Sequence, residues 1–95
     1  MKGGIIKMNY EFGKEEVLEQ AGCENVEIYM LVNNYGYTFK KGDVKFDLRH
    51  WLNCYGCDVN YWSLDGHNID TKDYVKLEKS TFDKFDEALE FIKTI

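Results

Sequence analysis

The segment from Arg49 to His67 contains both tryptophans, both histidines and two of the three cysteines of the chain. Cys54 and Cys57 form a C-x-x-C pair, a spacing found in dithiol redox sites and in zinc sites. Imidazoles and thiols bind metals or act as nucleophiles, and indole rings stack against ligands. We therefore expect any metal, redox or aromatic binding site to lie in this segment.

A dithiol redox enzyme needs a cysteine of lowered pKa, normally at the start of a helix. A helix predicted over residues 48–55 would instead place Cys54 near its end, where the helix dipole raises the pKa of a thiol. Thioredoxin-like folds also use a cis-proline, and this chain contains no proline. The sequence therefore does not favour a thiol oxidoreductase.

A zinc site needs four ligands, usually supplied as two close pairs. Cys54 and Cys57 supply one pair. The other candidate ligands are His50, one helical turn before Cys54, and the more distant His67 and Cys23. Because no second close pair exists, we expect no cofactor and keep a small zinc-binding protein as an alternative. Structural thiols and surface histidines are favoured over a cysteine–histidine nucleophile, so we predict no catalytic residues and no enzyme.

The charge of the chain argues against a simple nucleic-acid-binding protein. Its net charge is −5 and its isoelectric point is about 4.9, whereas phosphate binding normally requires a basic field. The charge is unevenly distributed, with six glutamates and one lysine in residues 11–27 and four basic residues in residues 40–49. Aromatic residues make up 16%, so some rings are expected on the surface, where tyrosine and tryptophan favour partner contacts.

Nothing in the sequence predicts a membrane segment or a disulfide framework. No run approaches the roughly 18–20 apolar residues of a membrane span, and residues 1–7 lack the apolar core of a signal peptide. The odd number of cysteines favours reduced thiols. We expect a cytoplasmic protein without membrane contacts.

Alternation of apolar and polar residues predicts strands joined by short turns. These strands are expected at residues 5–12, 25–33, 35–39, 44–48, 57–64 and 74–78, with a loop at residues 65–68. The strand at residues 25–33 has apolar residues on both sides and should be buried on both faces.

Helical spacing of apolar residues predicts three helices. The first covers residues 14–21. The second covers residues 48–55, with a strand continuing through Arg49 as the alternative. The third follows a cap at Ser80 or Thr81 and has an apolar stripe made of Phe82, Phe85, Ala88, Leu89, Phe91 and Ile92.

These elements predict an α+β fold in a single domain over residues 1–95. We expect a mostly antiparallel sheet of about five strands, a C-terminal helix packed on one face and one or two short helices. Trp51 is expected in the core, and either Tyr61 or Trp62 should face outward because neighbouring strand residues point to opposite faces.

The favoured function is a small acidic protein-binding module. Its composition is similar to that of inhibitors, immunity proteins and anti-defence proteins of bacteria and phages, which occupy a basic, nucleic-acid-binding surface of a partner. The predicted partner-binding residues are exposed acids and rings: Glu15, Glu16, Glu19, Glu24, Glu27, Tyr55, Tyr61, Trp62, Asp83, Glu87 and Glu90.

An alternative function follows from a resemblance. The stretch Phe46-Asp47-Leu48-Arg49-His50-Trp51, followed at a distance by Tyr74-Val75-Lys76-Leu77 and a capped helix, resembles the PC4-type family of single-stranded DNA-binding proteins. The resemblance implies that the Asp–aliphatic–Arg–x–aromatic stretch lies late in a strand. It also implies nucleic-acid binding through Lys40, Lys41, Lys45, Arg49 and neighbouring rings.

Overall fold

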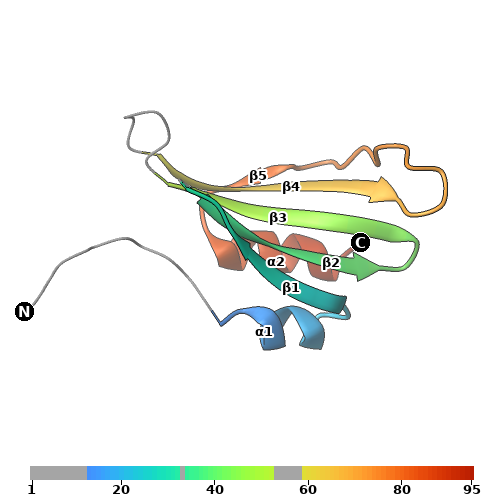
Figure 1. Cartoon of the computed structure of the whole chain (residues 1–95), viewed down its shortest axis with the longest axis horizontal. Coiled ribbons are helices and arrows are strands. Elements are labelled where there is room, and N and C mark those ends of the chain that lie inside the picture. Colours follow the sequence, from blue (N-terminus) through green and yellow to red (C-terminus); the bar gives the residue numbers. More distant parts are fainter. Residues whose placement is uncertain (1–12, 33, 53–58) are drawn as a thin grey trace, which may run out of the picture.

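The computed structural model describes residues 13–32, 34–52 and 59–95. The elements, in chain order, are α1 (Glu15–Gln20), β1 (Glu24–Met30), β2 (Asn34–Lys41), β3 (Val44–Leu52), β4 (Asn60–Asn68), β5 (Thr81–Phe82) and α2 (Phe85–Lys93). The five strands form one antiparallel sheet in the order β1-β2-β3-β4-β5 (Figure 1). The predicted α+β class, with its antiparallel sheet and C-terminal helix, is confirmed.

Both helices pack on the same face of the sheet, and α2 lies behind the sheet in Figure 1. Leu18 of α1 and Ile92 of α2 are fully buried in one apolar cluster with the inward side chains of the strands. Lys41 of β2 donates a hydrogen bond of 2.6 Å to the carbonyl oxygen of Ile92 and so ties the sheet to the end of α2. The opposite face of the sheet is not covered by either helix.

Alternation along β2, β3 and β4 produces this two-layer arrangement. The core side chains of these strands come from every second position: Tyr35, Tyr37, Phe39, Phe46, Leu48, His50, Leu52, Trp62 and Leu64. Four residues of the predicted stripe, Phe85, Ala88, Leu89 and Ile92, are buried on α2 against these residues, whereas Phe91 is partly buried and Phe82 lies on β5. Burial of these apolar side chains is the main stabilising contribution to the fold.

A helix was predicted over residues 48–55, of which the structure describes residues 48–52. Over these five residues the prediction is wrong. Strand β3 runs from Val44 to Leu52, as the alternative prediction had it, and pairs with β2 on one side and β4 on the other. Leu48 and Leu52 are four residues apart, which fits one helix face and also one strand face. Two ladders of backbone hydrogen bonds decide in favour of the strand.

The strand predicted at residues 25–33 exists but lies at the edge of the sheet, so its predicted burial on both faces is wrong. Ile28, Met30, Leu31 and Val32 are 37, 58, 51 and 92% exposed. Only β2 pairs with β1 among the described residues, which leaves one side of this strand without a neighbouring strand. The strand predicted at residues 5–12 lies outside the described residues.

Three boundaries in the C-terminal half also differ from the predictions. Strand β4 continues to Asn68, so the predicted loop at residues 65–68 is strand. The strand predicted at residues 74–78 is reduced to a single bridge from Tyr74 to β4. Residues Thr81–Phe82 form β5, and α2 begins four residues later than the predicted cap at Thr81. Within the described ranges, no helix has the length and apolar character needed to cross a membrane.

Candidate functional site: an arginine and aromatic cluster on the open sheet face

The two tryptophans lie on opposite faces of the sheet, so the predicted core position of Trp51 is wrong, and of the two alternatives Tyr61 and Trp62 it is Tyr61 that faces outward. Trp62 is fully buried against α2, so it presents no ring to a partner. Trp51 is partly exposed on the face that the helices leave free. Trp51 of β3 pairs with Tyr61 of β4, and Trp62 is the next residue along β4. Neighbouring positions in a strand face opposite sides, so Tyr61 points outward with Trp51.

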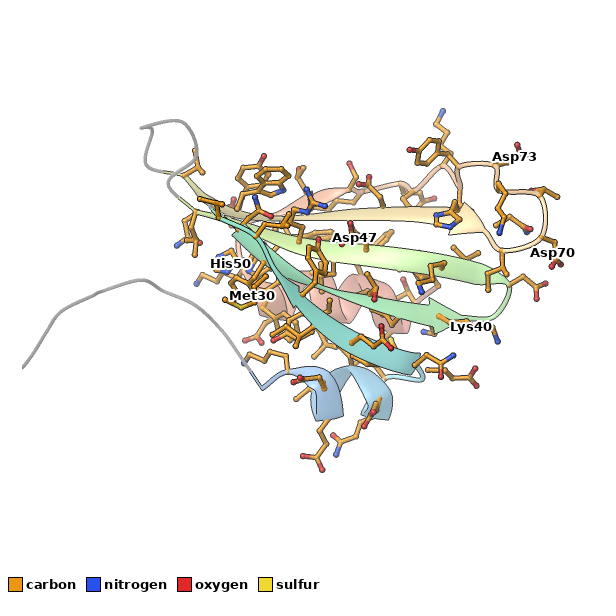
Figure 2. All side chains as sticks on the ribbon, viewed as in Figure 1. Met30, Lys40, Asp47, His50, Asp70 and Asp73 are labelled. Atoms are coloured by element: carbon orange, nitrogen blue, oxygen red, sulfur yellow. The ribbon has the colours of Figure 1, made fainter. Side chains whose placement is uncertain are left out.

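We call the side of the sheet that neither α1 nor α2 covers the open face. It carries the outward side chains of the four long strands, including Asp47, which Figure 2 shows near its centre. The outward residues include Glu27, Tyr29, Thr38, Lys40, Lys45, Asp47, Arg49, Trp51, Tyr61, Ser63, Asp65 and His67. The open face therefore combines aromatic rings with both signs of charge.

Hydrogen bonds hold the Arg49 side chain at the centre of this face. Its Nε donates to the Tyr29 hydroxyl oxygen at 2.7 Å, and its Nη2 lies 3.3 Å from Oδ2 of Asp47. The Tyr29 hydroxyl in turn donates to Oδ1 of Asp47 at 2.6 Å. The three side chains thus form a closed triangle in which each member contacts the other two, and this fixes the plane of the guanidinium group.

Two aromatic rings lie close to the guanidinium of Arg49. Its Cζ lies 5.5 Å from the ring centroid of Tyr29 and 5.1 Å from that of Trp51, both within cation–π range. Trp51 stacks beside Tyr61, with centroids 6.3 Å apart and planes inclined by 15°. The Trp51 indole donates to the Ser63 hydroxyl at 2.9 Å, which orients the ring. We call Tyr29, Asp47, Arg49, Trp51 and Tyr61 the Arg49 cluster.

The Arg49 cluster shifts the pKa values of its own members. Burial, assisted by the hydrogen bond to Asp47, raises the pKa of Tyr29 from 10.0 to about 12. Burial opposes the charge on Arg49, but the hydrogen bonds and charges of Tyr29 and Asp47 outweigh it and raise the pKa of Arg49. The cluster therefore keeps a neutral phenol and a permanent cation side by side.

The raised pKa of Tyr29 predicts a pH dependence of stability. Because folding raises this pKa, the stabilising contribution of the neutral phenol is complete below about pH 10 and is lost as the pH rises through about 12. Absorbance of tyrosinate at 295 nm should show one fewer group titrating near pH 12 in Tyr29→Phe than in the wild type. The Tyr74→Phe control should retain that component, and an unchanged titration in Tyr29→Phe would contradict the assignment.

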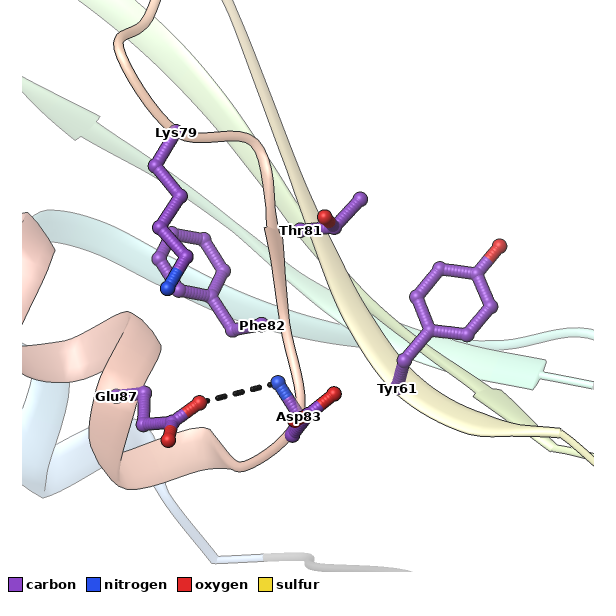
Figure 3. A pocket seen from close by; sticks show the side chains of 6 residues that line it. All are labelled: Tyr61, Lys79, Thr81, Phe82, Asp83 and Glu87. Carbon is purple, nitrogen blue, oxygen red and sulfur yellow. Dashed lines mark hydrogen bonds between the residues drawn. The ribbon is translucent and has the colours of Figure 1, made fainter.

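A shallow pocket of about 560 Å³ adjoins the cluster between β4, β5 and the start of α2 (Figure 3). Its lining brings together three of the predicted partner-binding residues, Tyr61, Asp83 and Glu87. Oε1 of Glu87 accepts a hydrogen bond of 3.1 Å from the backbone N–H of Asp83, which also closes the first turn of α2. One side of the pocket is thus aromatic and another acidic.

The other predicted partner-binding acids do not form one surface with this pocket. Glu15, Glu16 and Glu19 lie on α1, in the helix layer. Glu24 forms an exposed ion pair with Lys40 at 3.3 Å, and Glu90 of α2 pairs with Lys93 at 3.1 Å. Glu27 lies on β1 opposite Thr38, with its side chain toward the open face. Tyr55, also predicted to contact a partner, lies outside the described residues.

The predicted basic patch is divided between the two faces of the sheet. Lys40, Lys45 and Arg49 occupy outward positions on β2 and β3 and so share the open face. Lys41 lies on the helix side, where its ammonium group binds the carbonyl oxygen of Ile92. Three cations and the stacked rings therefore meet on one surface, alongside Asp47 and its neighbouring carboxylates.

The predicted surface position of His50 is wrong, because this side chain is fully buried. Its Nε2 donates to Oδ1 of Asn60 at 2.7 Å, so its Nδ1 accepts from the Tyr35 hydroxyl at 2.9 Å in the neutral ring. Both ring nitrogens are thus engaged, and the ring stacks on Trp62 with centroids 4.2 Å apart. These contacts make His50 a core residue in place of a metal ligand.

The thiol and metal candidates gain no support from the described ranges. Burial raises the pKa of the Cys23 thiol to about 11, which leaves it a weak nucleophile at neutral pH. His67 lies at the far end of β4, opposite Lys45. Residues 13–32, 34–52 and 59–95 contain no group of three or more potential metal ligands. Cys54 and Cys57 lie outside these ranges.

Sequence reasoning selected Arg49 and Tyr61 for this site but missed Tyr29, Asp47 and the outward position of Trp51. A signal was present, because Asp47, Arg49 and Trp51 are spaced by two and therefore share one face of a strand. The helix prediction concealed this spacing. Tyr29 comes from a separate strand, and only the register of β1 on β2 and β3 brings it to Arg49.

Comparisons with protein-family models, curated proteins and solved structures find no significant match.

Proposed function

We propose that this protein is a non-enzymatic binding module that engages a protein partner through its open face. The observation that carries the proposal is the position of Arg49, held by hydrogen bonds between the rings of Tyr29 and Trp51 on a face that no described helix covers. Arginine, tyrosine and tryptophan are the residues that most often dominate the energy of protein interfaces. Their fixed geometry here reduces the entropy lost on binding.

Charge favours a basic surface on the partner. The chain carries a net charge of −5, and the pocket lined by Asp83, Glu87 and Lys79 borders the open face beside Tyr61. Complementary charge speeds encounter and suppresses binding to acidic competitors. A protein of this kind would act as an inhibitor by covering a nucleic-acid-binding surface of its partner, as the composition predicts.

Affinity capture with matched variants tests this proposal. We expect a specific protein partner to be retained by the wild type and by Lys93→Ala, which removes a cation from the helix layer. Arg49→Ala and Trp51→Ala should each weaken binding by about 30-fold, or about 2 kcal/mol, because they remove central interface groups. The affinities are measured by calorimetry with the captured partner, after circular dichroism has shown that each variant is folded. Equal affinity of all four proteins would refute the proposed surface.

Single-stranded nucleic acid is a second candidate ligand for the same face. The stacked pair of Trp51 and Tyr61 lies beside Arg49, and Lys40 and Lys45 occupy the same side of the sheet. Rings next to cations are the usual platform for unpaired bases. Titration of a fluorescent oligonucleotide at low salt tests this function, which requires micromolar or tighter binding that weakens as salt is added. Absence of binding would exclude it.

A further inference from the structure

Strand β1 leaves one side of the sheet open to pairing. It has seven residues, and within the described residues it pairs only with β2. Natural sheets protect such edges with lysine, proline or a covering element, because an unpaired edge binds other strands. Residues 24–32 contain neither lysine nor proline. The irregular register between Glu24 and Glu27 interrupts only the beginning of the strand, so the protection does not extend to its end.

The exposed end of β1 is also apolar. Met30 is 58% exposed, Leu31 51% and Val32 92%, and Ile28 is 37% exposed. In Figure 2, Met30 lies at the opposite end of the β1–β2 pair from Lys40. Four apolar side chains within five consecutive positions favour contact with another apolar strand over contact with water.

Backbone geometry shows which groups point away from the sheet. Leu31 donates a hydrogen bond of 2.8 Å to the carbonyl oxygen of Asn34, which closes the hairpin between β1 and β2. Hydrogen-bonded and non-hydrogen-bonded positions alternate along antiparallel strands. Tyr29 is therefore bonded to β2 like Leu31, whereas the backbone N–H and C=O groups of Ile28 and Met30 point outward. Among residues 13–32, 34–52 and 59–95, no second strand bonds to these outward groups.

We propose that β1 pairs with β1 of a second copy of this chain, antiparallel about a twofold axis at Tyr29. Ile28 then pairs with Met30 of the partner subunit, and Met30 with the partner subunit's Ile28, so that the outward backbone groups bond to one another. Glu27 comes opposite the partner's Leu31. Ile28, Met30 and Leu31 are thereby covered by an identical strand.

Charge favours this occupant over an acidic strand. No carboxylate lies opposite a carboxylate in the twofold register, because Glu27 faces an apolar residue. The two Glu27 residues are offset by four positions along the strand direction, which is about 13 Å at 3.3–3.4 Å per residue. Salt at physiological strength screens charges beyond about 8 Å. An acidic strand would repel Glu27.

Pairing in this way joins two sheets into one and keeps all helices on the same side. The two Tyr29 side chains become cross-strand neighbours on the open face, so the Arg49 clusters of both subunits lie on a single continuous surface. An interface of one strand pair is small, and we expect dissociation in the micromolar range or weaker. The inference rests on the edge of the sheet alone and does not depend on the ligand of the open face.

Sedimentation velocity of the full chain over a wide concentration range tests the dimer. We expect the mass to rise from 11.2 kDa toward twice that value. Met30→Lys should raise the dissociation constant at least about tenfold, because lysine disfavours edge pairing. The control Tyr74→Lys changes a side chain that is 86% exposed outside β1 and should dimerise like the wild type. A single monomeric species at every concentration would overturn the proposal. The edge of β1 would then have to pair with a strand other than that of a second copy.

Disulfide trapping tests the register. In a background with Cys54→Ser and Cys57→Ser, Tyr29→Cys should form an intermolecular disulfide on mild oxidation, because non-hydrogen-bonded partners have Cα atoms about 4.5 Å apart. Glu27→Cys is the matched control, since its twofold mate is offset by four positions and cannot be reached. A dimer that cross-links equally through both positions would contradict pairing about Tyr29.

Discussion

Replacing Trp62 with alanine should lower the free energy of unfolding by about 3–5 kcal/mol, the usual range for deleting a buried aromatic side chain. Trp62 is fully buried, stacks on His50 at 4.2 Å and meets the edges of Tyr35 and Phe85 at 5.9 and 5.2 Å. Its buried indole nitrogen has no hydrogen-bond partner in the described structure. The loss therefore comes from packing and from the cavity that remains.

Trp51→Ala is the matched control because it removes the same side chain from the open face. Trp51 is partly exposed, and it contacts Arg49, Tyr61 and the Ser63 hydroxyl on the open face. We expect a loss of about 1 kcal/mol or less, in the range of single cross-strand pairs. Urea unfolding followed by circular dichroism measures both variants. Equal losses would show that the two rings are not divided between core and surface.

The architecture could be predicted from sequence where one periodicity dominates. Tyr35, Tyr37 and Phe39 alternate with polar residues and became the buried side of β2. Phe85 and Leu89 follow the helical period and became the buried stripe of α2. In these segments local pattern and tertiary burial agree, so no other interaction has to be known.

The prediction failed where two patterns overlap. Leu48, Trp51 and Leu52 have helical spacing, and Leu48 and Leu52 also share one face of a strand. The pairing of β3 with strands on both sides selects the strand, and this pairing is not visible in a local window. The burial of β1 was mispredicted for the same reason. Apolar alternation shows that a strand exists but not whether it is central or at the edge.

The candidate site depends on a glycine for which no function was predicted. Gly36 lies on β2 directly opposite Tyr29. A Cβ atom at this position would lie 2.7 Å from the Tyr29 hydroxyl oxygen and 2.7 Å from the carbonyl oxygen of Leu48. The phenol ring of Tyr29 therefore crosses β2 over the bare backbone of Gly36 to reach Asp47 and Arg49 on β3. Aromatic residues commonly cover a glycine on a neighbouring strand in this way.

Gly36→Ala should consequently break the Arg49 cluster and also destabilise the fold, by about 1–3 kcal/mol, the usual cost of overpacking. The Leu48 carbonyl belongs to the backbone of β3 and cannot move aside, so the Tyr29 ring must be displaced. Displacement exposes the phenol and breaks its bond to Asp47, and both changes lower the pKa of Tyr29 from about 12 toward its ordinary value of 10.0.

Urea unfolding measures the loss of stability in Gly36→Ala, and tyrosinate absorbance measures the pKa of Tyr29 in the same variant. Thr38→Ala, two residues along the same face of β2, is the control and should change stability by less than about 1 kcal/mol and leave the pKa of Tyr29 unchanged. A Gly36→Ala protein that retains the late tyrosine titration would show that Tyr29 reaches Asp47 without crossing Gly36. If both readouts change together, the absence of a side chain at position 36 is what allows the separate strands β1 and β3 to form one binding surface.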